Sequence, residues 1–269
     1  MAKLATQSWG GGEDGERPLA VLLHGITSSS GSWRRVGPAL AERGWGVVAV
    51  DLRGHGDSPA GQEGALHGTG GVGITELAAD VAETISRRPV ELVVGHSLGA
   101  LTVMTLLGAE PGFAKHAVIE DPPCREAVNP AQMIADIERD VARVRDDPEG
   151  YLAELQQPPY GMEREDAEVK LSAMQRLDAA TAIAELGGEF QFDVVALARA
   201  IQVPTLLFLA REANGSALTG QARHDVATAL ASGWTEVVDC GHNVHREAFD
   251  SFMRRLDAWL DRVGAAAVA

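Results

Sequence analysis

The GHSLG segment at residues 95–99 constrains the fold of this chain more than any other part of the sequence. It directly follows an apolar run, residues 90–94, and precedes residues 100–107, which are apolar nearly all round. The first run predicts a buried strand and the second a buried helix, so the segment between them predicts a sharp strand-to-helix turn. Glycines on both sides of Ser97 leave room for the crowded backbone of such a turn, which lifts the serine hydroxyl above the sheet. Ser97 is therefore the candidate nucleophile.

Length and composition indicate one α/β core with an insertion. The 269 residues exceed the usual single-domain size of about 100–200 residues. Hydrophobic residues make up 45% of the chain, and no uninterrupted apolar stretch reaches the roughly 18 residues that a membrane span needs. The first nine residues hold no apolar stretch of signal-peptide length, and two cysteines are too few for a disulfide framework. We therefore expect a soluble protein in the cytoplasm.

Charge narrows the classes of partner. The formal net charge is −15, whereas nucleic acids and anionic membranes are bound by clustered Lys and Arg. We expect neither as a partner. Residues 126–168 hold 12 acidic and 4 basic residues, and such a surplus near an entrance disfavours anions such as acyl-CoA. This balance favours a small, neutral, apolar substrate, while a monomer and a homodimer both remain open.

Short apolar runs bounded by turn residues predict a mostly parallel sheet flanked by helices. They lie at residues 19–23, 47–50, 90–94, 117–119, 205–209 and 234–238. Leu77, Val81 and Ile85 recur at four-residue spacing, which predicts a crossover helix with Thr75 as its cap. Residues 4–9 predict an edge strand that leads into a glycine-rich turn.

The pattern changes between residues 124 and 199, where strand-like runs are missing and helical spacing takes over. Met133, Ile137, Val141 and Val144 follow that spacing. We interpret residues 1–123 and 200–269 as the α/β core and residues 124–199 as a helical insertion.

A serine hydroxyl needs a general base, and the base needs an acid to orient it. His242 directly follows the last predicted strand, where a loop can reach a serine at the top of the sheet. His242 is our candidate base and the nearby His245 its competitor. His96, next to Ser97, is expected to support the site by packing.

Several motifs together resemble the α/β-hydrolase fold enzymes. His24-Gly25, the DLRGHGDS loop at residues 51–58, the Ser97 turn and Gly241-His242 occur in the order seen in that family. The resemblance implies the α/β-hydrolase fold, with the insertion as a cap domain. It also implies that the backbone N–H groups of Ile26 and Leu98 form the oxyanion hole, and that residues 51–58 are a structural loop.

The acid is the point at which this sequence departs from the common family pattern. Most relatives place an aspartate after the penultimate strand, where this chain has Ala213. Some haloalkane dehalogenases and a fungal macrolactone hydrolase instead carry a glutamate at the end of the preceding strand, which corresponds to Glu120 here. We therefore take Glu120 as the acid, and keep Glu212 and Asp121 as alternatives.

Cap side chains are candidates for a substrate pocket, because Met adapts to irregular apolar shapes and Tyr adds a polar tip. The candidates are Met133, Tyr151, Tyr160, Met162 and Met174. No spacing typical of a metal site is present, and we expect no cofactor.

These residues together predict a serine hydrolase that cleaves a neutral carboxylic ester or lactone through an acyl-enzyme on Ser97. C–C bond hydrolysis, thioester hydrolysis and perhydrolysis remain open, since the pocket and not the triad selects the substrate. A ligand receptor that retains the triad is the alternative of another class. The resemblance disfavours epoxide hydrolases and haloalkane dehalogenases, because their nucleophile is an aspartate.

Overall fold

The protein forms a seven-stranded sheet, seen in a computed structural model that describes residues 3–11, 17–60, 73–85, 88–187 and 192–265. The strand order is β1-β3-β2-β4-β5-β6-β7, and only β1 is antiparallel to its neighbour. The strands are β1 (Thr6–Trp9), β2 (Leu19–Leu23), β3 (Gly46–Val50), β4 (Val90–His96), β5 (Ala114–Glu120), β6 (Thr205–Ala210) and β7 (Gly233–Val238). The predicted sheet and edge strand are thus confirmed.

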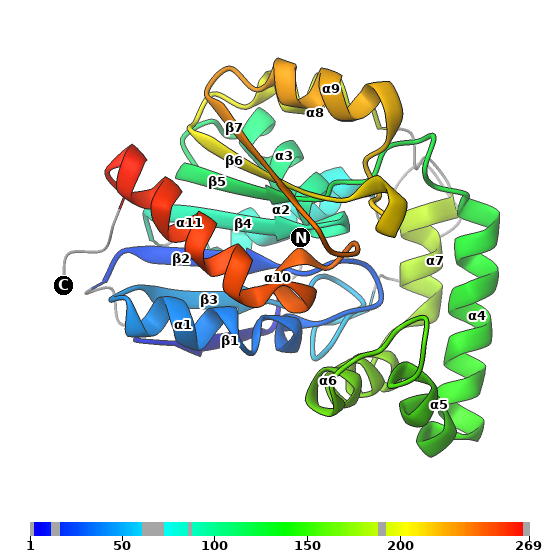
Figure 1. The fold of residues 1–269 in the computed structure, drawn as a ribbon. Helices are drawn as coiled ribbons and strands as arrows, with labels where there is room; N and C mark the ends of the chain where they lie inside the picture. Colours follow the sequence, from blue (N-terminus) through cyan, green and yellow to red (C-terminus); the bar gives the residue numbers. More distant parts are fainter. Residues whose placement is uncertain (1–2, 12–16, 61–72, 86–87, 188–191, 266–269) are drawn as a thin grey trace.

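Helices cover both faces of the sheet (Figure 1). One face carries α2 (Ile74–Ile85), α3 (Leu98–Ala109), α8 (Val194–Ala200) and α9 (Gly220–Ala229). The other face carries α1 (Val36–Glu42) and α11 (Phe249–Val263), with α10 (Val244–Glu247) just before α11. Two short 3-10 helices, η1 (Ser30–Trp33) and η3 (Glu212–Asn214), lie in connecting loops.

The strands serve both layers because successive side chains point to opposite faces. In β2, Leu19, Val21 and Leu23 join the core under α2 and α3, while Ala20 and Leu22 join the core under α1 and α11. Every residue of β2 is buried. A strand covered on both faces reads as a continuous apolar run, which is why the sequence revealed it.

The cap consists of four helices that lie to one side of the sheet (Figure 1). They are α4 (Pro130–Asp146), α5 (Pro148–Leu155), α6 (Arg164–Gln175) and α7 (Ala179–Gly187). Ile137 and Val144 of α4 pack with buried residues of the other three helices in a core of their own. The helical spacing read from the sequence was therefore correct.

Two details differ from the sequence prediction. α8 falls inside the predicted cap range but packs against α3 and α9, so it belongs to the sheet-covering layer. Its valines are as apolar as those of a cap helix, and only the packing separates the two cases. Thr75 lies within the first turn of α2 rather than before it, and Glu76 accepts a hydrogen bond from the Gly73 N–H at 3.0 Å.

Among the described helices, none combines the length and the apolar character needed to cross a membrane.

Candidate active site

Ser97 sits on the turn between β4 and α3, with an unusual backbone conformation. Its φ of 53° and ψ of −116° are strained for a residue with a side chain. A Cβ on Gly95 would lie 2.3 Å from the Gly99 carbonyl oxygen, and one on Gly99 would lie 2.4 Å from the Leu23 carbonyl oxygen. Both glycines are therefore required for α3 to start so close to the sheet.

Replacing Gly99 with alanine is expected to destabilise the protein by about 3 kcal/mol, because the new methyl group meets backbone atoms that cannot move independently. Urea unfolding measures this change. Gly112→Ala is the matched control, since a Cβ there meets nothing within 4 Å, and its effect should stay within about 0.5 kcal/mol. Equal stabilities of the two variants would contradict the close packing of the turn.

His242 lies in the loop after β7 and contacts Asp121. Its Nδ1–H donates to Asp121 Oδ2 at 2.6 Å, which leaves Nε2 free to accept a proton. Asp121 is fully buried and also accepts hydrogen bonds from the Ala210 N–H, the Ser216 hydroxyl and the Ala217 N–H. These contacts replace the water that the carboxylate loses on burial. The structure thus pairs the predicted base with Asp121, one of the two alternative acids.

Glu120, our first choice from the sequence, does not contact His242. It is fully buried and binds His245, whose Nδ1–H lies 2.8 Å from Oε1 and whose backbone N–H also donates to Oε1 at 3.0 Å. Successive side chains leave a strand end in different directions. Glu120 ends β5, and Asp121 follows with a positive φ of 43°, so their carboxylates reach different histidines.

The other alternative acid, Glu212, lies on η3 and is directed to α9. It accepts from the Gly220 N–H at 3.2 Å and forms a long ion pair with Arg223 at 4.0 Å. It makes no contact with His242 among the described residues. Glu212 is therefore a surface residue beside the site, and the structure does not bring it to His242.

Three histidines gather around the end of β4. The His96 ring lies 4.6 Å from that of His242 and 5.1 Å from that of His245, between ring centroids. Burial lowers the pKa of His96 well below its usual value, and the neighbouring histidines lower it further. Neutral His96 donates from Nε2 to the His242 carbonyl oxygen at 3.1 Å. It therefore positions the loop that carries His242, as the sequence reading expected of a supporting residue.

The predicted oxyanion-hole residues flank Ser97. Leu98 is the first residue of α3, so its N–H has no acceptor within the helix. Ile26 lies in the loop after β2, and Ser97, Leu98 and Ile26 line one cavity. A Cβ on Gly25 would lie 3.1 Å from the Ser97 Cβ, which shows how closely this loop approaches the serine.

The 51–58 loop holds the Ile26 loop in place. His55 Nε2 accepts from the Thr27 N–H at 3.2 Å, and Asp51 Oδ1 accepts from the Ser30 N–H at 2.6 Å. Burial lowers the pKa of His55 to about 3, so this histidine is neutral and can accept. These contacts agree with the structural role that the resemblance implied.

The cavity between the core and the cap has a volume of about 560 Å³. Ser97 and His242 lie on its wall, together with the predicted cap residues Met133, Tyr160 and Met162. Tyr151 and Met174 do not line it, because they are buried in the cap core. Helical spacing identifies a buried face but cannot tell a pocket wall from a packed interior.

Two positively charged residues of the cavity wall were not among the candidates from the sequence. Lys170 comes from α6 and Arg246 from α10. Neither stands in a motif, and both read as ordinary surface cations. His242 lies four residues before Arg246, and that proximity was the one available signal.

No hydrogen bond joins the Ser97 hydroxyl to His242 in the described part of the chain. The two side chains share the cavity wall, and contacts between nucleophile and base commonly tighten only when substrate is bound. The described residues contain no group of three or more His, Cys, Asp or Glu that could hold a metal ion.

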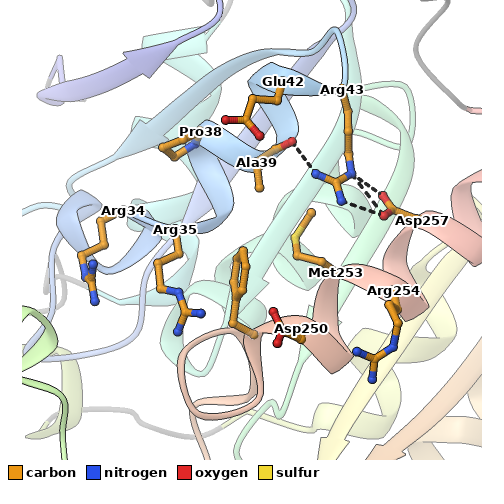
Figure 2. Close-up of a pocket in the computed structure, with 11 residues that line it drawn as sticks. Arg34, Arg35, Pro38, Ala39, Glu42, Arg43, Asp250, Met253, Arg254 and Asp257 are labelled. Atoms are coloured by element: carbon orange, nitrogen blue, oxygen red, sulfur yellow. Dashed lines mark hydrogen bonds and ion pairs between the residues drawn. The ribbon is translucent and has the colours of Figure 1, made fainter.

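A second hollow, of about 520 Å³, lies between α1 and α11 (Figure 2). Arg43 donates to both oxygens of Asp257 there. The Arg35 guanidinium stacks 4.1 Å from the centre of the Phe249 ring. Among the described residues that line it there is no serine, cysteine or histidine. It is a charged surface groove without a nucleophile.

The sheet order, the serine turn and the His–Asp pair define the class of α/β hydrolases. A family model described as "Alpha/beta hydrolase family" matches residues 20–255, and the chain belongs to this family. It is a hydrolase.

Three known proteins illustrate the likeness. Epoxide hydrolase B of Mycobacterium tuberculosis is 39% identical over 100 residues, which are 36% of this chain and 27% of that protein. The 2-(acetamidomethylene)succinate hydrolase of Mesorhizobium japonicum is 33% identical over 111 residues, 40% of this chain and 37% of that protein. The enol-lactonase of Burkholderia xenovorans LB400 has the same fold, with a TM-score of 0.74, 21% identity and 96% of both chains covered. The matches to the first two span less than half of either protein.

Proposed function

We propose that this protein hydrolyses a carboxylic ester or lactone through an acyl-enzyme on Ser97. The observation that carries the proposal is that Ser97, the Asp121-bound His242 and the first N–H of α3 meet at one cavity. This set supplies a nucleophile, a base and a donor for the developing oxyanion.

In the first half of the reaction, the Ser97 oxygen attacks the substrate carbonyl carbon, and His242 Nε2 takes the serine proton. The carbonyl oxygen gains the negative charge, and the N–H groups of Ile26 and Leu98 stabilise it. The carbon–oxygen bond to the alcohol then breaks, and His242 returns its proton to the leaving oxygen. Asp121 holds the ring in the tautomer that both transfers require.

Water completes the cycle. His242 Nε2 removes a proton from a water molecule, whose oxygen attacks the acyl carbon. The bond to Ser97 breaks and the serine oxygen recovers the proton from His242. A lactone gives one ring-opened product, whereas an open ester gives an acid and an alcohol.

The names of similar proteins support the reaction class and leave the substrate open. One structural neighbour is an enol-lactonase, and one partial relative is a 2-(acetamidomethylene)succinate hydrolase. A third match is an epoxide hydrolase, a reaction that the resemblance associates with an aspartate in place of Ser97. The serine is the feature that favours acyl transfer here.

A fluorophosphonate probe is expected to react once per molecule, with Ser97 displacing fluoride, because the probe reports an activated serine. Intact mass and peptide mapping locate the adduct. In parallel, p-nitrophenyl acetate and butyrate should be hydrolysed over many turnovers per site. At most one turnover per molecule, with a ligand-dependent rise in melting temperature, would indicate a ligand receptor and not an enzyme.

A further inference from the structure

Lys170 brings an ammonium group from the cap into the cavity. Its Nζ donates to the Thr27 carbonyl oxygen at 2.8 Å and to the Thr27 hydroxyl at 2.7 Å. An ammonium has three donors, so one remains for a ligand. Among the described residues, no carboxylate lies within ion-pair distance of Lys170.

Arg246 brings a second cation to the same wall, four residues after His242. Its guanidinium makes a long ion pair with Glu247 at 3.8 Å, and within the described chain it donates no hydrogen bond. The side chain is only 18% exposed. A mostly buried guanidinium on a cavity wall, with its planar set of donors unused by the described residues, is a strong site for a carboxylate.

The cavity has too little negative charge of its own to balance these groups. Glu247 is the one carboxylate among the described residues that line it. It already accepts hydrogen bonds from the Gly241 N–H at 2.7 Å and the Asn243 N–H at 3.2 Å. Two cations against one carboxylate leave an excess of one positive charge.

The acidic residues of the cap act on these cations only from behind the cavity wall, where Asp140 attracts Lys170 and Asp166 attracts Arg246. None of those at positions 126–168 is part of the described cavity wall. Several are exposed and pair with arginines, as Glu165 does with Arg34 at 2.7 Å. The surplus that favoured a neutral substrate in the sequence therefore lies outside the cavity, whose interior has the opposite sign.

We infer that the substrate carries a free carboxylate, held by Arg246 and Lys170 while its ester or lactone carbonyl lies at Ser97. The inference rests on the proposed function and specifies its substrate class. A carboxylate supplies the single negative charge that the wall lacks, and its two oxygens match the donors of Arg246. The carboxylate end of the substrate is thereby held near the His242 loop, which leads to Arg246, and near α6, which carries Lys170.

The test uses pairs of substrates that differ only in charge. Monoethyl succinate, glutarate and adipate are each compared with the corresponding carboxamide, in which CONH₂ replaces the carboxylate. The ratio of kcat/KM for acid over amide is expected to be at least about 10, since hydrogen bonds to charged groups exceed neutral ones by about that factor. Arg246→Met should lower this ratio at least tenfold, and Lys170→Met should also lower it.

Arg254→Met is the matched control, because Arg254 lies in the other groove, on α11 (Figure 2). This variant should keep the wild-type ratio. A ratio near 1 in the wild type, or a ratio that survives Arg246→Met, overturns the carboxylate site even if Ser97 is labelled. No turnover of any ester and no labelling of Ser97 would instead mean that the proposed function itself fails.

The pH dependence of the acid-to-amide ratio tests whether Lys170 binds the substrate carboxylate or only holds Thr27 in position. Burial lowers the pKa of Lys170 to about 8. The charged and titratable groups that interact with its ammonium are Asp140 on α4, Arg246 on α10 and the histidines His24 and His55. The ammonium is present below pH 8 and is lost above it. The acid-to-amide ratio should therefore fall as the pH rises through about 8, and Lys170→Met should remove this step.

Competitive inhibition by small anions tests whether the site of Arg246 and Lys170 prefers a carboxylate. Glutarate is expected to inhibit competitively, and glutaramide is not. Inorganic phosphate that binds more tightly than glutarate would overturn the assignment to a carboxylate.

Discussion

Replacing Ser97 with alanine is expected to lower kcat for ester hydrolysis at least about 10³-fold. The acyl-enzyme needs the serine oxygen, and water in its place has no comparable position relative to His242 and the two N–H groups. Multiple-turnover assays with p-nitrophenyl butyrate measure the loss. The fold should be preserved, because the side chain of Ser97 makes no hydrogen bond within the described residues and alanine removes one oxygen atom.

Ser172→Ala makes the same chemical change on α6, at a residue that is not part of the described cavity wall, and should keep the wild-type rate. Thermal melting of both variants tests the folded state. A Ser97→Ala enzyme that retains more than about a hundredth of the wild-type kcat would refute Ser97 as the nucleophile.

Asp121→Asn and Glu120→Gln are expected to have opposite signatures. An asparagine amide at position 121 can donate to His242 and favours the wrong tautomer, so kcat should fall by about 10³–10⁴-fold. Glu120→Gln should lower kcat by less than about tenfold. It should instead reduce the free energy of unfolding by about 1–3 kcal/mol, because it weakens a buried contact to both the ring and the backbone of His245.

Steady-state kinetics and urea unfolding of both variants give the two signatures. A larger loss of kcat in Glu120→Gln than in Asp121→Asn would identify Glu120, the residue that the sequence favoured, as the acid. Double replacement is not needed, since the two carboxylates bind different histidines.

Local patterns were enough to locate the strands of this fold. Apolar runs marked β2, β3, β4 and β6, because strands buried on both faces exclude most polar residues. β7 is mostly exposed, and only Trp234, Val237 and Val238 marked it. β5 was predicted too short, at residues 117–119, since Lys115 and His116 interrupt its apolar run. The turn at Ser97 was recognisable because two glycines are sterically required beside it.

The choice between neighbouring carboxylates could not be read in the same way. Glu120 and Asp121 are adjacent in the chain, and both are fully buried. What separates them is a single change of backbone direction, with Asp121 at φ 43° beyond the strand end. The pairing also depends on Ser216 and Ala217, which lie about 95 residues away in the sequence.

The sequence by itself determined the apolar runs of the parallel sheet and the serine turn, and it was enough to propose His242 as the base, because each depends on residues close together in the chain. Only the tertiary structure decided that Asp121 holds His242, that Tyr151 and Met174 lie in the cap core, and that Lys170 and Arg246 face the cavity. Those outcomes depend on the direction of side chains from elements that meet only after folding. Net charge illustrates the difference: the sequence gives its total, and the fold decides which charges line a cavity and which lie in water.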